Sequence, residues 1–122
     1  MKSTLSQIIL DVANLERSLE FYAGVLKMRV SPAAGFGGHP MAHLSNGETE
    51  LLLIQGGSDG ADYDRRGGVI LSFQISSIAD VLSNSEQMGL TVLRGMEGGS
   101  NQVRSVLIAD PDNYAILLSE AA

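Results

Sequence analysis

The feature that most constrains this chain is an internal repeat in the order of its expected elements. In residues 7–12, apolar side chains alternate with a more polar set, as expected of a strand with one buried face. Residues 69–75, at the start of the second half, show a similar pattern. A helical pattern and three further strand patterns follow each of these strands. We therefore predict two copies of a βαβββ unit, each about 55 residues long, which together fill nearly the whole chain.

The two expected helices carry recognisable end signals. Asn14 is a favoured N-cap residue, and apolar side chains recur at helical spacing from Leu15 to Leu26. The second helical pattern begins at Ile78 and ends at Gly89, a residue type that commonly follows the last turn of a helix.

Turn and loop signals separate the remaining strands. The dipeptide Asn46-Gly47 is a strong hairpin signal, and the Gly/Pro-rich residues 31–40 predict a loop. The remaining strands are expected at residues 28–30, 41–45, 50–55, 91–93, 102–109 and 114–120. One domain over residues 1–122 follows, with module one at about 5–57, a linker at about 56–68 and module two at about 69–120. The fold class is α+β, with two βαβββ modules forming curved mixed sheets around a cleft and the helices outside.

Charge and cysteine content exclude several classes of function. The chain has 14 acidic and 8 basic residues, a net charge of −6, which argues against nucleic acid and anionic membrane as partners. It has no cysteine, so disulfides and thiolate chemistry are excluded, and a cytoplasmic location is the simplest expectation. The first apolar run is broken at Asp11 and is too short for a signal or membrane segment.

Three motifs together resemble the vicinal oxygen chelate superfamily, which includes glyoxalase I, extradiol dioxygenases, fosfomycin-resistance enzymes and bleomycin-resistance proteins. The motifs are residues 14–18 (NLERS), the pair Phe21-Tyr22, and residues 110–112 (DPD) before a short apolar strand. Two positions depart from the family pattern. Lys27 stands where glycine is usual, and Asn113 replaces the glycine of the late turn.

The resemblance implies where a metal would be bound. Metal-using members place His or Gln on the first strand of each module and Glu on the last strand. The corresponding positions here are Gln7, Ile70, Leu52 and Leu117, of which only Gln7 offers a ligand oxygen. A catalytic metal needs about three protein ligands, and an apolar wall solvates a dication poorly. The resemblance therefore implies a member without a metal or other cofactor.

Two histidines are the next candidates for chemistry. His39 and His43 have i, i+4 spacing, but Pro40 lies between them and the context is a loop running into a strand, so a helical metal pair is not expected. If Ala42 and Leu44 face the helix, His43 faces the cleft and is a candidate for ligand hydrogen bonding or acid–base chemistry. The alternative is a strand histidine whose ring nitrogens are satisfied by neighbouring groups.

Other charged residues are weaker candidates. By strand parity Arg104 is expected to point into the cleft, where a guanidinium could hold a carboxylate, or else to be a solvated residue paired with an acid. Glu50 shares the parity of Gln7 and is a weak candidate for a base. Asp110 and Asp112 are interpreted as turn chemistry.

These observations leave three functions open. The leading hypothesis is a metal-independent protein that binds a small, mostly apolar or aromatic compound. It is similar to the bleomycin-resistance branch, where sequestration and not chemistry is the activity. The alternative is a metal-free lyase, isomerase or dioxygenase-like enzyme that uses His43 or Glu50 as a base and Arg104 as an anion anchor. A degenerate protein-interaction module is the third. The resemblance also implies a homodimer. The expected ligand-binding residues are Gln7, His43, Leu52, Ile70, Arg104 and Leu117.

Overall fold

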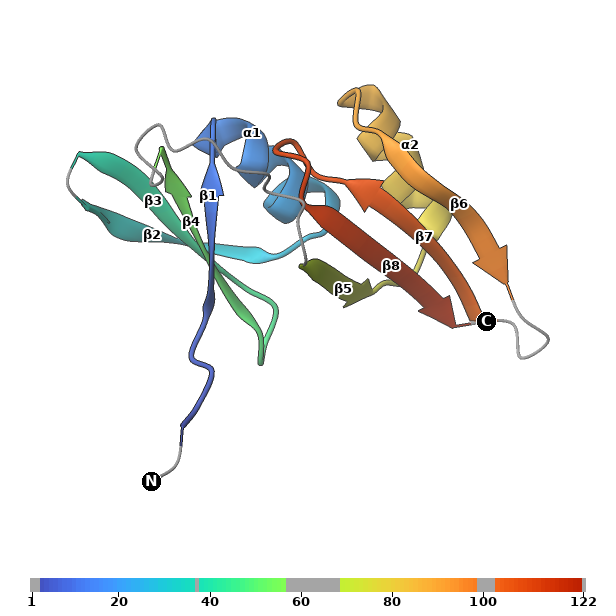
Figure 1. Ribbon diagram of the computed structural model, residues 1–122, viewed down its shortest axis with the longest axis horizontal. Coiled ribbons are helices and arrows are strands. Elements are labelled where there is room, and N and C mark those ends of the chain that lie inside the picture. The colour runs from blue at the N-terminus through green and yellow to red at the C-terminus, as the bar shows by residue number, and fades with distance from the viewer. Residues whose placement is uncertain (1–2, 37, 57–68, 99–102, 122) are drawn as a thin grey trace. The chain divides into compact units, whose positions relative to one another are not determined.

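The computed structural model shows two four-stranded sheets, each accompanied by a helical segment (Figure 1). The chain divides into two units, Met1–Asp62 and Tyr63–Ala122. Each unit has the element order βαβββ, so the predicted α+β fold of two modules is confirmed. The residues that the structure describes are 3–36, 38–56, 69–98 and 103–121.

The first unit has a mixed sheet with the strand order β1-β4-β3-β2. The pair β1–β4 is parallel, and the other two pairs are antiparallel. Its elements are β1 (Ile8–Val12), α1 (Leu15–Leu19), the π-helical η1 (Glu20–Val25), β2 (Arg29–Phe36), β3 (His39–Ser45) and β4 (Glu50–Gln55). The helical face of the sheet is apolar because Leu10, Val12, Leu51 and Leu53 are all buried.

The first helical segment starts and ends close to the predicted residues. The Asn14 side chain accepts a hydrogen bond from the Arg17 N–H at 3.0 Å, as expected of an N-cap. Phe21 and Tyr22 are fully buried and pack edge to face, with ring centroids 4.9 Å apart. Leu26 caps the segment, and Lys27 follows with φ of 63°, a conformation that glycine adopts without strain.

The second unit repeats this arrangement with the strand order β5-β8-β7-β6. The pair β5–β8 is parallel and the others are antiparallel. Its elements are β5 (Ile70–Gln74), α2 (Ile78–Gln87), β6 (Val92–Gly98), β7 (Val103–Ala109) and β8 (Ala115–Ala121). Ser77 is the N-cap of α2. Gly89 follows its last turn with φ of 75°, as the sequence predicts.

The repeat extends to the hydrogen bonds that tie each helix to its sheet. In the first unit the Leu15 N–H donates to Gln55 Oε1 at 2.7 Å. In the second unit the Ile78 N–H donates to Glu120 Oε2 at 2.6 Å. Each last strand therefore supplies an acceptor for an N–H that the first helical turn leaves unsatisfied.

The turn before β8 confirms the interpretation of its acidic residues. Asp110 is buried, and its Oδ1 accepts from the N–H groups of Asp112 at 2.9 Å and Tyr114 at 2.8 Å. Asn113 has φ of 72°, which asparagine tolerates better than most residues.

Two loop predictions are wrong. The predicted loop 31–40 is largely strand, because β2 continues to Phe36 and β3 begins at His39. Both β2 and β6 are edge strands, where a proline or an irregularity costs few ladder hydrogen bonds. The edge strand β6 likewise continues to Gly98, beyond the strand that was predicted at residues 91–93. Most of the predicted linker, from residue 57 to 68, lies outside the described residues.

Candidate functional site

Each sheet has one face covered by its helix and one opposite face, which we call the open face. The segment α1 packs against β3 and β4, and α2 packs against β8. In β1, Leu10 is buried on the helical side, whereas the preceding residue, Ile9, lies on the open face and is 56% exposed. The alternation of side chains along each strand then assigns every neighbouring residue to one of the two faces.

In the first unit the strand register places predicted residues side by side. Ile9 is aligned with Leu52, Leu52 with His43, and His43 with Ser31, so these four form one row across the open face. The neighbours of His43 on β3, Ala42 and Leu44, are buried on the helical side. His43 therefore lies on the open face, aligned with Leu52, as expected for a residue between two helix-facing neighbours.

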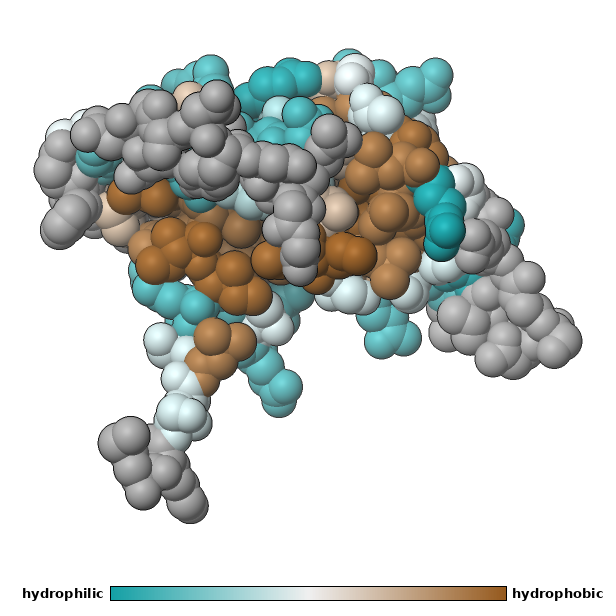
Figure 2. Space-filling view, viewed as in Figure 1, coloured by the Kyte–Doolittle hydropathy of each residue, from teal (hydrophilic) through white to brown (hydrophobic). Residues whose placement is uncertain are grey.

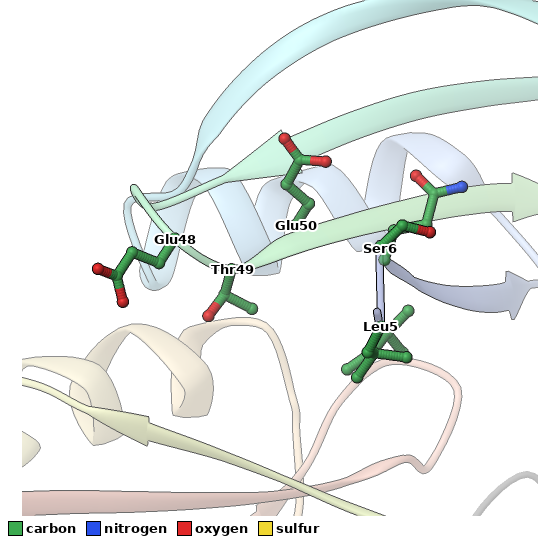
Figure 3. Close-up of a pocket in the computed structure, with 7 residues that line it drawn as sticks. Leu5, Ser6, Glu48, Thr49 and Glu50 are labelled. Atoms are coloured by element: carbon green, nitrogen blue, oxygen red, sulfur yellow. The ribbon is translucent and has the colours of Figure 1, made fainter. Parts of the chain in front are cut away.

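Gln7 and Glu50 line a separate hollow of about 130 Å³ at the start of β1 and β4 (Figure 3). Its other lining residues are Leu5, Ser6, Ile8, Glu48 and Thr49. The carboxylates of Glu48 and Glu50 point away from each other in Figure 3. They do not converge on a common point, so this hollow does not have the geometry of a cation site.

In the second unit the open face carries a pocket of about 170 Å³ with an apolar floor. Ile70 and Leu117, two of the predicted positions, both line it. Leu107 and Arg94 also line this pocket. Leu107 is aligned with Leu117, and Arg94 is aligned with Leu107. Ser105, Gly95 and Val106 complete the lining. Figure 2 shows hydrophobic side chains gathered over β7 and β8 on the face toward the viewer.

The sequence analysis missed Arg94, Leu107 and Ser105 as site residues. Arg94 was missed because its strand was predicted to end at Leu93, whereas β6 runs to Gly98. The β6–β7 pairing has register shifts on both sides of Arg94, so its face could not have been derived from simple alternation. Leu107 could have been found, because it alternates with Val106 and Ile108 in β7.

The orientation predicted for Arg104 is wrong. Arg104 is aligned with Glu120, and it shares the parity of the buried, helix-facing Val106. Its Nη1 lies 3.9 Å from Glu120 Oε1, the carboxylate that also accepts from the first turn of α2. The second alternative for this residue, an exposed strand arginine paired with an acid, is the one observed.

The sequence was also compared with known proteins. The profile of the Glyoxalase/Bleomycin resistance protein/Dioxygenase superfamily matches residues 4–118. The chain belongs to this superfamily. No curated protein matches it significantly.

Solved structures similar to the chain have the same fold. One is a hypothetical protein from S. aureus, with a TM-score of 0.78, 16% identity and coverage of 99% of this chain and 95% of that one. Another is the fosfomycin resistance protein FosX from Listeria monocytogenes, with a TM-score of 0.77, 19% identity and coverage of 100% and 94%. A glyoxylase/bleomycin resistance protein/dioxygenase domain from Frankia sp. has a TM-score of 0.71, 22% identity and full coverage of both chains.

The residues present do not fit the metal centre of metal-using members of the superfamily. Leu52, Ile70 and Leu117 have no atom that can bind a metal, and Gln7 is left as a single amide ligand. Within the described ranges, no three or more His, Asp or Glu side chains are grouped so that they could hold a metal ion. Neither described helix has the length and apolarity that crossing a bilayer requires.

Proposed function

We propose that this superfamily member binds a small, mostly apolar or aromatic compound on the open faces of its sheets, without a metal. One observation carries this proposal. Ile70 and Leu117, at two of the positions where metal-using relatives place ligands, line one pocket whose floor is apolar. Leu52, at the third such position, lies beside His43 in the first unit and is itself buried.

The energetics of such a surface favour an apolar ligand over an ion. Burying about 100 Å² of apolar ligand surface contributes roughly 2.5 kcal/mol. A dication against the same side chains would lose hydration that one amide cannot replace. We therefore expect a ring or short hydrocarbon to contact the aliphatic side chains of the second-unit pocket.

The proposal is tested by titrating the neutral apolar dye N-phenyl-1-naphthylamine against wild type and Leu117→Glu. The substitution places a carboxylate in the apolar floor, so the dye should bind about tenfold more weakly or worse. Val92→Glu is the matched control, because Val92 is 50% exposed and is aligned with the helix-facing Ile108 on the same sheet.

Circular dichroism checks that both variants are folded. If folded Leu117→Glu binds the dye as tightly as wild type, the pocket is not the binding site and the proposal fails. Leu52→Glu, tested in the same way, asks whether the equivalent position of the first unit contributes.

The proposal includes two expectations about the protein's setting. We expect a homodimer, as the family resemblance implies, and a cytoplasmic location, as the lack of cysteine favours. Light scattering coupled to gel filtration measures the oligomeric state. The alternative hypothesis, a metal-free enzyme, requires Arg104 as its anion anchor. Arg104 lies on the helical side of its sheet, away from the pocket. Binding is therefore the function that the geometry supports better.

A further inference from the structure

The pocket of the second unit has a charged side chain at one edge of its apolar floor. Ile70, Leu107 and Leu117 form the floor, and Arg94 and Ser105 also line the pocket. The register explains the arrangement. Leu117, Leu107 and Arg94 are aligned across β8, β7 and β6, so the guanidinium-bearing residue and the two leucines share one row of the open face.

The local backbone holds Arg94 at this position. The β6–β7 register shifts both between Val92 and Arg94 and between Arg94 and Glu97, whereas Arg94 itself stays aligned with Leu107. Irregularities of this kind re-aim side chains at strand edges and beside binding sites. In β7, Ser105 lies two residues from Leu107 and therefore on the same face.

From this row we infer that the pocket takes an amphipathic anion: a single ring or short hydrocarbon that carries a carboxylate, with the ring on the leucines and the carboxylate on Arg94. The inference rests on the proposed function and specifies its ligand class. A guanidinium fork matches a carboxylate in geometry, and a charge-assisted hydrogen bond is about twice as strong as a neutral one. The hydroxyl of Ser105, which also lines the pocket, is a further donor.

The size of the pocket limits the ligand to about one ring. A dry protein cavity of about 150 Å³ accommodates benzene. The pocket here is about 170 Å³ and open at one side, so it suits a six-membered ring whose carboxylate reaches the rim. The net charge of −6 repels anions at long range, so any preference for an anion must come from a local cation.

The test compares benzoate, an anion at neutral pH, with benzamide, its neutral analogue of nearly the same shape. Both are titrated into ¹⁵N-labelled full-length protein, and amide chemical shifts report affinity, location and folding in one sample. Wild type should bind benzoate about tenfold more tightly than benzamide at low salt, with the shifts centred on β6, β7 and β8. The preference should shrink as salt is raised, because the guanidinium is exposed.

Three variants localise the preference for benzoate. Arg94→Gln should remove most of the tenfold preference for benzoate over benzamide. Arg104→Gln is the matched control, because this exposed arginine lies on the other side of the same sheet and should leave the preference intact. Arg94→Lys, which keeps the charge but not the fork, should retain part of it.

The outcomes separate this inference from the proposed function. Equal binding of benzoate and benzamide by wild type overturns the inference and leaves an apolar binding site standing. A preference that survives in Arg94→Gln, or that disappears in Arg104→Gln, also overturns it. If neither compound shifts any resonance of β5–β8, the inference and the proposed function both fail.

Discussion

Asp110 is the residue at which a single substitution should most clearly disrupt the second unit. Its side chain is only 2% exposed, and its Oδ1 accepts two backbone hydrogen bonds, from Asp112 at 2.9 Å and from Tyr114 at 2.8 Å. The Asp110 N–H also donates to the Tyr114 carbonyl at 3.0 Å, so the carboxylate organises the turn that leads into β8.

The expected loss in the free energy of unfolding follows from the two hydrogen bonds that Asp110 Oδ1 accepts. A hydrogen bond to a charged group contributes about 1.5–3 kcal/mol, and one oxygen shared by two donors gives less than twice that value. Asp110→Ala should therefore lower the free energy of unfolding by about 3 kcal/mol, since it leaves two N–H groups without their acceptor. Asp110→Asn keeps a carbonyl oxygen in place and should cost about 1 kcal/mol.

Urea denaturation followed by circular dichroism measures both losses. Ser45→Ala is the matched control in the turn of the first unit, because its hydroxyl accepts one exposed bond from the Gly47 N–H at 3.3 Å. The control should cost less than about 0.5 kcal/mol. A loss below about 1 kcal/mol for Asp110→Ala would refute the claim that the carboxylate holds this turn together.

Two further substitutions test the fold. Lys27→Gly should raise the free energy of unfolding by about 0.5–1 kcal/mol, because Lys27 has φ of 63° and glycine adopts that conformation without strain. Thermal unfolding beside the control Lys27→Ala checks this, and a loss of stability would contradict it. Phe73→Ala should cost about 2 kcal/mol, less than a fully buried phenylalanine, because Phe73 is half-buried opposite Leu118. A change below about 0.5 kcal/mol in urea unfolding would show that the side chain does not pack there.

The elements that were predicted well are those with strong local signals. Asn14 begins a helix as its N-cap and Gly89 ends one, because these residue types satisfy or relax the backbone at helix ends. The repeat of element order was enough to predict two βαβββ modules. The extents of the edge strands were not predicted, because Gly and Pro in β2 and β6 resemble loop residues and are tolerated where only one neighbouring strand is present.

The site was predicted in part. Ile70 and Leu117 were named from the family resemblance, and both line the pocket of the second unit. Arg104 was assigned to the wrong face, because its parity was set without the alignment that pairs it with Glu120. Arg94 could not be placed at all, since its face depends on irregular pairing between β6 and β7 and not on any periodic pattern.

The central claim is that aliphatic side chains have replaced metal ligands, so that the protein works without a metal. Native mass spectrometry tests it most directly, using protein incubated with an equivalent of Zn²⁺, Ni²⁺, Fe²⁺ or Mn²⁺ and then desalted. Because Leu52, Ile70 and Leu117 cannot ligate a metal, the account predicts the mass of the metal-free protein in every case. A stoichiometric metal adduct that survives desalting and raises thermal stability would contradict it.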